Sequence, residues 1–289
     1  MKTFEKLLQF SLINIDKPAG PTSYKVSEFV RRELGLSKTS HMGTLDPKVT
    51  GVLPITLGRA CKLADYFIKH DKSYVGVLHT HKEQDLKELQ KLINKNFLGK
   101  IKQTPPSRSA VKRAERVREV YEFKFLEVSE DSRSFLFSCK VEGGTYIRKI
   151  CSDLGDYVDK KTGFTVGGAH MDELRRTEAG IFDEAKIYTL EEFEVAVDEY
   201  KSGDFGKLKS MLIPAEDAIR EVLKIVLVDK RAVKSLHNGK PLFKRDIVGK
   251  IVKFKEGNKF SVFCGEEFIG VYRKTGENEI FGRAKFVYN

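Results

Sequence analysis

The sequence predicts an α+β fold, with a mixed, mainly antiparallel sheet and a small β domain at the C-terminal end. Residues 121–128 and 135–141 alternate apolar and polar side chains on either side of a polar turn, which is typical of an antiparallel strand pair. Residues 22–35 and 83–97 carry apolar side chains at helical spacing instead. From Leu223 onwards, short apolar runs alternate with glycine-rich turns, which indicates a separate β unit.

The elements of the larger unit follow from local patterns. Residues 11–15 alternate and end at a Lys-Pro turn, so we expect a strand there. Thr22 or Ser23 can cap the helix that follows, and Gly35 can end it. After a loop rich in glycine and proline, the remaining elements are expected in this order: a helix over 59–68, a strand over 72–78, the helix over 83–97, the strand pair within 121–141, a helix over 147–157, a strand over 166–177, a helix over 190–200 and another starting at 214.

We interpret residues 1–221 as a catalytic domain and residues 222–289 as the small β domain. The strands of the small domain are expected within 224–228, 250–254, 260–263, 268–272 and 280–286.

Charge is distributed unevenly along the 289 residues, whose formal net charge is +11. Residues 222–289 contain 15 Lys and Arg against 7 Asp and Glu, a local excess of +8. A second basic run spans 102–118. Such blocks favour a partner with a phosphate backbone, and an ordinary solvated basic face is the alternative.

Neither a disulfide framework nor a metal site is indicated. The cysteines Cys61, Cys139, Cys151 and Cys264 lack paired spacing, and no acidic or thiol partner accompanies His79 and His81 at ligand spacing. No apolar run is long enough to cross a membrane, and no signal-peptide pattern occurs at the N-terminus, so we expect a cytoplasmic protein.

The loop over 41–51 places Asp46 before a proline and between two glycines. A residue before proline favours extended backbone, and the glycines allow tight turns that could direct the carboxylate into a cleft. Asp-Pro also begins ordinary turns, so the loop alone leaves both interpretations open.

Neighbouring segments resolve the question through a resemblance. Asp16-Lys17-Pro18-Ala19-Gly20-Pro21-Thr22-Ser23 precedes the loop, and Gly51-Val52-Leu53-Pro54 and Gly58-Arg59-Ala60-Cys61-Lys62 follow it. Together with Lys72-Ser73-Tyr74, Gly144 to Arg148 and Leu174 to Thr177, in this order, they resemble the TruB family of pseudouridine synthases. The resemblance implies that Asp46 is the catalytic residue.

The same resemblance implies roles for four further side chains, and His41 of the loop is a further candidate. Tyr74 would stack on the target base, Tyr146 would lie beside the base and Leu174 would close its apolar side, although an aromatic residue at a strand start is otherwise a core residue. His41 would touch the flipped nucleotide or merely shape the loop. Arg148, otherwise an exposed helix arginine, would pair with Asp46; a guanidinium favours the ionised carboxylate and fixes its orientation.

The implied reaction breaks the bond between N1 and C1′ of uridine, rotates the base and rejoins it through C5. It needs no external reactant, so no cofactor or metal is expected. The uridine must be flipped out of its stack. Asp46 could attack C1′ or C6, or act as a base at C2′, and the sequence does not choose among these.

The C-terminal unit, with Ala232 to Lys240, resembles a PUA domain, an RNA-binding module. The side chains expected to contact RNA are Lys17, Arg108, Lys112, Arg113, Lys234 and Lys240.

Two branches of the family fit the sequence. Two features favour the archaeal and eukaryotic dyskerin branch: the short connection after Leu78 and the amino-acid sequences of residues 46–51 and 105–113. The absence of long lysine-rich tails favours an archaeal member. The resemblance then implies an H/ACA ribonucleoprotein acting on ribosomal RNA or tRNA. Its partners would be guide RNA, substrate RNA and zinc-ribbon-like, β-barrel and kink-turn-binding proteins. A stand-alone synthase for the tRNA T-loop is the alternative.

Overall fold

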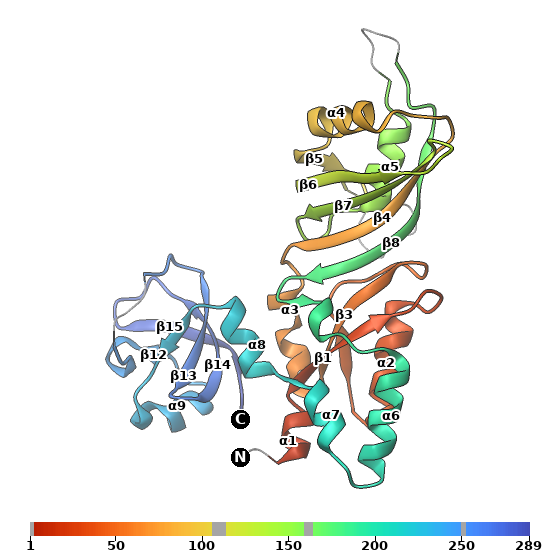
Figure 1. Cartoon of the computed structure of the whole chain (residues 1–289). Coiled ribbons are helices and arrows are strands. Elements are labelled where there is room, and N and C mark those ends of the chain that lie inside the picture. The colour runs from red at the N-terminus through yellow and green to blue at the C-terminus, as the bar shows by residue number, and fades with distance from the viewer. Residues whose placement is uncertain (1–2, 106–113, 159–163, 250–252) are drawn as a thin grey trace.

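The computed structural model describes residues 3–105, 114–158, 164–249 and 253–289. Within these residues, ten strands form one large sheet and five form a second sheet. Figure 1 shows the large sheet as a long band, with the second sheet beside one end of it, next to α8 (Ala215–Val222). The predicted α+β class is confirmed.

The large sheet has the order β10-β1-β3-β8-β4-β7-β6-β5, with β2 paired to β3 and β9 paired to β8. Its described pairs are antiparallel except for β3 and β8, which run parallel where Gly51 faces Arg176. This junction joins the two halves of the sheet. The strands are β1 (Ser11–Lys17), β2 (Thr39–His41), β3 (Thr50–Leu57), β4 (Lys72–Thr80), β5 (Gly99–Gln103), β6 (Arg116–Val128), β7 (Ser134–Val141), β8 (Ala169–Ala179), β9 (Phe182–Asp183) and β10 (Ile213–Pro214).

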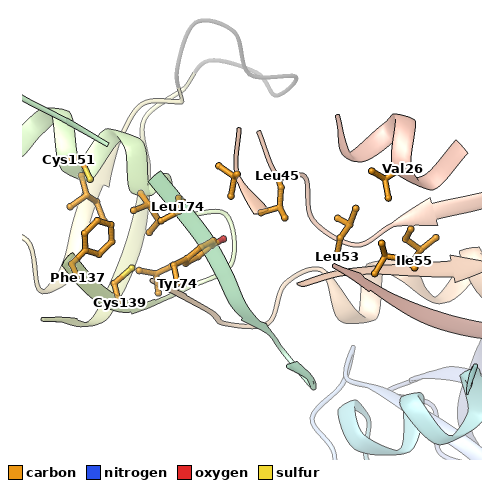
Figure 2. Packing of buried hydrophobic residues seen from close by; sticks show 14 of the residues in the cluster. Val26, Leu45, Leu53, Ile55, Tyr74, Phe137, Cys139, Cys151 and Leu174 are labelled. Carbon is orange, nitrogen blue, oxygen red and sulfur yellow. The ribbon is translucent and has the colours of Figure 1, made fainter. Parts of the chain in front are cut away.

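Helices cover the sheet through their apolar stripes. The side chain of Thr22 caps α2 by accepting a hydrogen bond from the Lys25 amide at 3.2 Å. Val26 of α2 is buried in one cluster with Leu53 of β3, as Figure 2 shows. The α-helices are α1 (Phe4–Leu8), α2 (Ser23–Glu33), α3 (Ala64–Phe67), α4 (Leu86–Asn96), α5 (Ile147–Gly155), α6 (Leu190–Lys201), α7 (Gly206–Met211), α8 and α9 (Val233–His237).

The second sheet has the order β11-β13-β14-β15-β12 and its own buried core around Phe260 and Tyr272. A separate apolar cluster joins it to the larger unit, and in that cluster Phe10 stacks on Tyr288 with ring centroids 4.1 Å apart. The strands are β11 (Ile225–Leu227), β12 (Leu242–Phe243), β13 (Lys259–Cys264), β14 (Glu267–Lys274) and β15 (Ile280–Val287).

Some predicted bounds were wrong. The helix expected over 59–68 is a 3-10 helix, Gly58–Leu63, followed by the short α3. The first two amides of this segment bond to carbonyls of distant segments. The helix expected from residue 83 begins at Leu86, where the Asp85 side chain caps it. Of the strand expected over 250–254, residues 250–252 lie outside the described residues, and Lys253 and Phe254 are not in a strand.

Candidate active site

The loop that carries Asp46 lies between β2 and β3, at the parallel junction in the middle of the large sheet. Leu45 is buried, and both of its backbone polar groups bond to one side chain of α2. The Ser23 hydroxyl donates to the Leu45 carbonyl at 3.0 Å and accepts from the Leu45 amide at 2.8 Å. These two hydrogen bonds fix the backbone beside Asp46. The side chain of Asp46 is 46% exposed.

Asp46 pairs with Arg148, which stands in the first turn of α5. Arg148 Nη2 lies 3.1 Å from Asp46 Oδ2, and the two side chains are 50% and 46% exposed. Tyr146, the residue preceding α5, is held in turn by the buried Gln103, which donates to its carbonyl at 3.1 Å and accepts from its amide at 3.0 Å. The end of β5 therefore orients the start of the helix that supplies the guanidinium.

Tyr74 and Leu174 form the apolar part of the site. Each is 8% exposed, and they come from the neighbouring strands β4 and β8 within the same cluster as Leu45. Figure 2 shows the Tyr74 ring near Leu174, with its hydroxyl directed toward the side of Leu45. Burial raises the pKa of Tyr74, and the charge of Arg176 opposes that shift.

Lys17 does not lie on an RNA-facing surface, so that prediction was wrong. Its side chain is fully buried, and Nζ donates to the carbonyls of Pro18, Pro47 and Val49 at 2.8, 3.0 and 2.8 Å. Three carbonyls satisfy the three donors of the ammonium group, which leaves none for a phosphate. Burial lowers the pKa of Lys17, and the charge of Asp46 opposes that shift. Lys17 instead anchors the Asp46 loop through the carbonyls of Pro47 and Val49.

The other predicted residues occupy three environments. His41 is half-buried and its Nε2 lies 3.2 Å from Thr44 Oγ1; burial and then the charge of Arg176 lower its pKa. Lys234 in α9 and Lys240 between α9 and β12 are exposed. The predictions for Arg108, Lys112 and Arg113 fall outside the described residues.

Sequence reasoning missed several buried polar side chains around the site, above all Arg176, which is 1% exposed. Strand alternation could have found it, because Arg176 shares a sheet face with Leu174. Lys72 is 5% exposed and donates to the carbonyls of Ile68, at 2.6 Å, and His70. Burial, followed by the charge of Arg176, lowers the pKa of Lys72 to about 8.

The described residues show neither a cluster suited to a metal ion nor a membrane-spanning helix. No group of three or more His, Cys, Asp or Glu in that part of the chain is arranged to hold a metal ion. His79 and His81 both face the ring of His170, at centroid distances of 5.3 and 5.5 Å. No helix there is long and apolar enough to cross a membrane.

The arrangement suits reaction at a base or sugar carbon. A half-exposed carboxylate can reach a substrate and a guanidinium fixes its orientation, while a buried aromatic ring and an aliphatic neighbour provide apolar packing beside the loop.

Comparisons with known proteins match nearly the whole chain. The TruB family pseudouridylate synthase N-terminal domain matches residues 31–147, and the tRNA pseudouridylate synthase B C-terminal domain matches residues 148–220. A "Probable tRNA pseudouridine synthase B" of Korarchaeum cryptofilum is 43% identical over 253 residues, 87% of this chain and 74% of the relative. One with the same name from Archaeoglobus fulgidus is 37% identical over 286 residues, 98% of this chain and 85% of the relative.

Among solved structures, a Cbf5-Nop10-Gar1 complex matches with TM-score 0.86 and 32% identity, over 99% of this chain and 87% of the other. An H/ACA RNP bound to a substrate RNA containing 2′-deoxyuridine matches with TM-score 0.85 and 30% identity, over 100% of this chain and 88% of the other. The chain belongs to the TruB family of pseudouridine synthases and is an RNA isomerase.

Proposed function

We propose that the chain is the catalytic subunit of a guide-RNA-directed pseudouridine synthase of the H/ACA type, with Asp46 as its catalytic carboxylate. The ion pair of Asp46 with Arg148, at 3.1 Å in the middle of the large sheet, is the observation that carries the assignment of the site. The similarity to H/ACA complex structures over 99% and 100% of this chain supports the guide-directed role.

In this proposal the uridine is flipped so that its ring rests on Tyr74 and Leu174. Arg148 orients Asp46, which attacks C1′ or C6 or removes a proton at C2′. The N1–C1′ bond breaks, the base turns and C5 bonds to C1′. The proton leaves C5 for solvent and N1 gains one, so the product is an isomer of the substrate.

RNA contacts outside the site supply the energy for flipping. We assign residues 1–221 to catalysis and 222–289 to an RNA-binding domain of the PUA type, in which the exposed Lys234 and Lys240 meet phosphates. Arg108, Lys112 and Arg113 are proposed as further RNA contacts. The partners are guide RNA, substrate RNA and the three small proteins expected above, in accord with the complexes that the chain resembles.

Replacing Asp46 tests the catalytic assignment. Asp46→Asn keeps the size of the side chain but removes the nucleophile and base, so we expect no turnover, with folding and RNA affinity preserved. Release of tritium from RNA labelled at C5 of uridine measures turnover. Asp65→Asn, at an exposed carboxylate of α3, serves as the matched control and should keep wild-type turnover. Turnover retained in Asp46→Asn contradicts the assignment.

The second candidate, a stand-alone synthase for the tRNA T-loop, is favoured by the names of the curated relatives. Product formation on a T-arm RNA without guide RNA separates the two. The guide-directed proposal expects conversion of an unpaired target uridine only when a complementary guide RNA and the small proteins are present. Efficient guide-free conversion of the T-arm would overturn the guide-directed proposal and leave Asp46 chemistry intact.

A further inference from the structure

Arg176 of β8 is a buried cation without an acidic partner in the described part of the chain. It is 1% exposed and is the largest by volume of the fully buried side chains in the described residues. The cationic Lys72, itself 5% exposed, lies close enough for the charge of Arg176 to lower its pKa. Burying a cation without a carboxylate costs several kcal/mol, so stability alone does not explain a guanidinium at this position.

The adjacent Arg175 shows the usual arrangement for comparison. Its side chain is on the opposite face of β8, 37% exposed, and it donates to both oxygens of Asp16 at 2.9 and 2.8 Å and to Glu184 at 2.6 Å. Two neighbouring arginines of one strand therefore have opposite environments, and only Arg176 lacks an acid.

The contacts of Arg176 converge on the segment that carries Asp46. Nε donates to the Val52 carbonyl at 2.8 Å, and Nη2 donates to the Gly43 carbonyl at 3.0 Å. Gly43 and Val52 lie on either side of Asp46 in the chain. Arg176 also lies directly opposite Tyr74 in the register of β4 and β8, and its charge opposes the rise in the pKa of Tyr74 that burial causes. One planar group thus bonds to both ends of the Asp46 loop and lies beside the strand that carries the aromatic ring.

The backbones close in on Arg176 as well. Gly51 has φ +98°, and a Cβ there would lie 2.2 Å from the Arg176 carbonyl oxygen, so β3 approaches β8 more closely than any other residue permits. At Gly43, φ is +97° and a Cβ would lie 3.3 Å from Arg176 Nη1. Gly51 lets β3 approach the backbone of Arg176, and Gly43 lets the other end of the loop approach its guanidinium.

We propose that Arg176 is a positioning residue for the isomerisation: its guanidinium holds the Asp46 loop and the Tyr74 ring in one fixed relative geometry. It does not touch the uridine. Its fixed planar fork of N–H donors reaches the Val52 and Gly43 carbonyls at once, a geometry that a lysine or a neutral amide does not reproduce. A displacement of about 1 Å between reacting groups costs about 100-fold in rate, which sets the expected effect of losing this group.

The experiment compares Arg176→Gln, Arg176→Lys, Tyr74→Phe and the double variant Arg176→Gln/Tyr74→Phe with the unaltered protein. Tritium release from C5-labelled uridine is followed under single turnover with saturating enzyme, on whichever of the two RNA substrates described above the unaltered protein converts. Failure of the guide-directed proposal therefore leaves this test intact. RNA affinity by filter binding and the melting temperature are measured for each variant, and rates are taken well below melting.

We expect Arg176→Gln to lower the single-turnover rate about 100-fold while RNA affinity stays unchanged. Arg176→Lys should recover part of the rate, because it keeps the charge but not the fork. The double variant should lose less than the product of the two single losses, because Arg176 acts partly through Tyr74. Arg175→Gln, the matched control, should keep the wild-type rate.

Three results would overturn the proposal. The first two are a wild-type single-turnover rate per folded molecule in Arg176→Gln and a wild-type rate in Arg176→Lys. The third is a rate loss in the double variant equal to the product of the two single rate losses. A merely structural arginine would lower the melting temperature without changing the rate of the folded fraction. If Arg176→Gln does not fold, the rates of Arg176→Lys and of a second double variant, Arg176→Lys/Tyr74→Phe, decide the question by the same criteria.

Discussion

Three buried cations near the Asp46 loop, Lys17, Lys72 and Arg176, donate hydrogen bonds to backbone carbonyls. Lys17 binds the carbonyls of Pro47 and Val49 inside the loop, Arg176 binds those of Gly43 and Val52, and Lys72 binds two carbonyls ahead of β4. The carbonyls of the loop are thus turned inward onto cations while its carboxylate is turned outward to Arg148. This division leaves Asp46 accessible and its backbone immobile.

Arg148 has a role that can be measured separately from folding, because its side chain is 50% exposed. We expect Arg148→Gln to lower the single-turnover rate about 100-fold by releasing the Asp46 carboxylate from its orientation. The melting temperature should hardly change, since exposed ion pairs contribute about 1 kcal/mol or less. Lys149→Gln, at the next residue of α5, controls for loss of a helix cation and should retain the rate. An unchanged rate in Arg148→Gln would contradict the pairing role.

The low pKa of Lys72 predicts a pH dependence of stability. In the folded chain this pKa is about 8, against 10.5 for an unperturbed lysine. Below pH 8 both states carry the proton, and between pH 8 and 10.5 only the unfolded chain does, so the free energy of unfolding rises with pH by up to about 3 kcal/mol.

Urea unfolding between pH 7.5 and 10 measures this rise. We expect the free energy of unfolding of Lys72→Met to show no such rise with pH. Lys62→Met, at an exposed lysine of the preceding 3-10 helix, should still show the rise. Equal slopes for the Lys72→Met variant and the unaltered chain would show that Lys72 titrates normally.

At the scale of elements, α2 and β5 act as supports for loops that they do not belong to. Ser23, the first residue of α2, bonds both backbone groups of Leu45, and Gln103, the last residue of β5, bonds both backbone groups of Tyr146. Each pair joins the end of one regular element to the residue next to a functional side chain. The site is therefore as rigid as the sheet and helix that hold it.

Removing the Ser23 hydroxyl should damage both stability and rate. Ser23→Ala leaves a buried amide and a buried carbonyl without a partner, at about 1 to 3 kcal/mol each. We also expect the single-turnover rate to fall, because the backbone beside Asp46 is released.

The control for this prediction is Ser27→Ala, one turn later on α2, where the hydroxyl bonds to Thr39 of β2 instead of the loop. It should lose stability while the folded fraction keeps its rate. If both serine variants lose rate equally, Ser23 has no special part in placing the loop. Urea unfolding and tritium release together measure the two effects.

At the scale of the whole molecule, an aromatic contact holds the second sheet against the larger unit. Phe10 is 1% exposed and its ring contacts those of Phe268, Phe286 and Tyr288. Arg59 adds polar contacts by donating to the carbonyls of Asn289 and Val287. A cavity of about 520 Å³ opens beside this contact, and its lining includes none of the residues assigned to the Asp46 site.

We expect Phe10→Ala to lower the free energy of unfolding by about 3 to 5 kcal/mol, as for other buried aromatic residues. Because the lost contact joins the two units, their unfolding should separate into two transitions. Phe193→Ala, at a fully buried ring of the larger unit, should cost a similar amount without this separation. Calorimetry distinguishes the cases, and a single transition in Phe10→Ala would mean that other contacts couple the units.

The sequence by itself determined the local elements and the residue types of the chemistry. Helical and strand periods located α2, α4 and most strands within a few residues. The order of short motifs identified the family and predicted Asp46, Tyr74 and Arg148 as site residues. These features depend on neighbours along the chain, which the sequence contains directly.

Only the tertiary structure decided which polar residues are exposed at the candidate site and which are buried. The sequence predicts an RNA contact at Lys17, which is instead buried against the Pro47 and Val49 carbonyls. Arg176, one of two adjacent strand arginines, is buried and bonded to the Gly43 and Val52 carbonyls. The reason is physical: a buried cation is tolerated only where carbonyls from separate segments converge on it. That convergence, like the contact of Asp46 with Arg148, arises only when the sheet has formed.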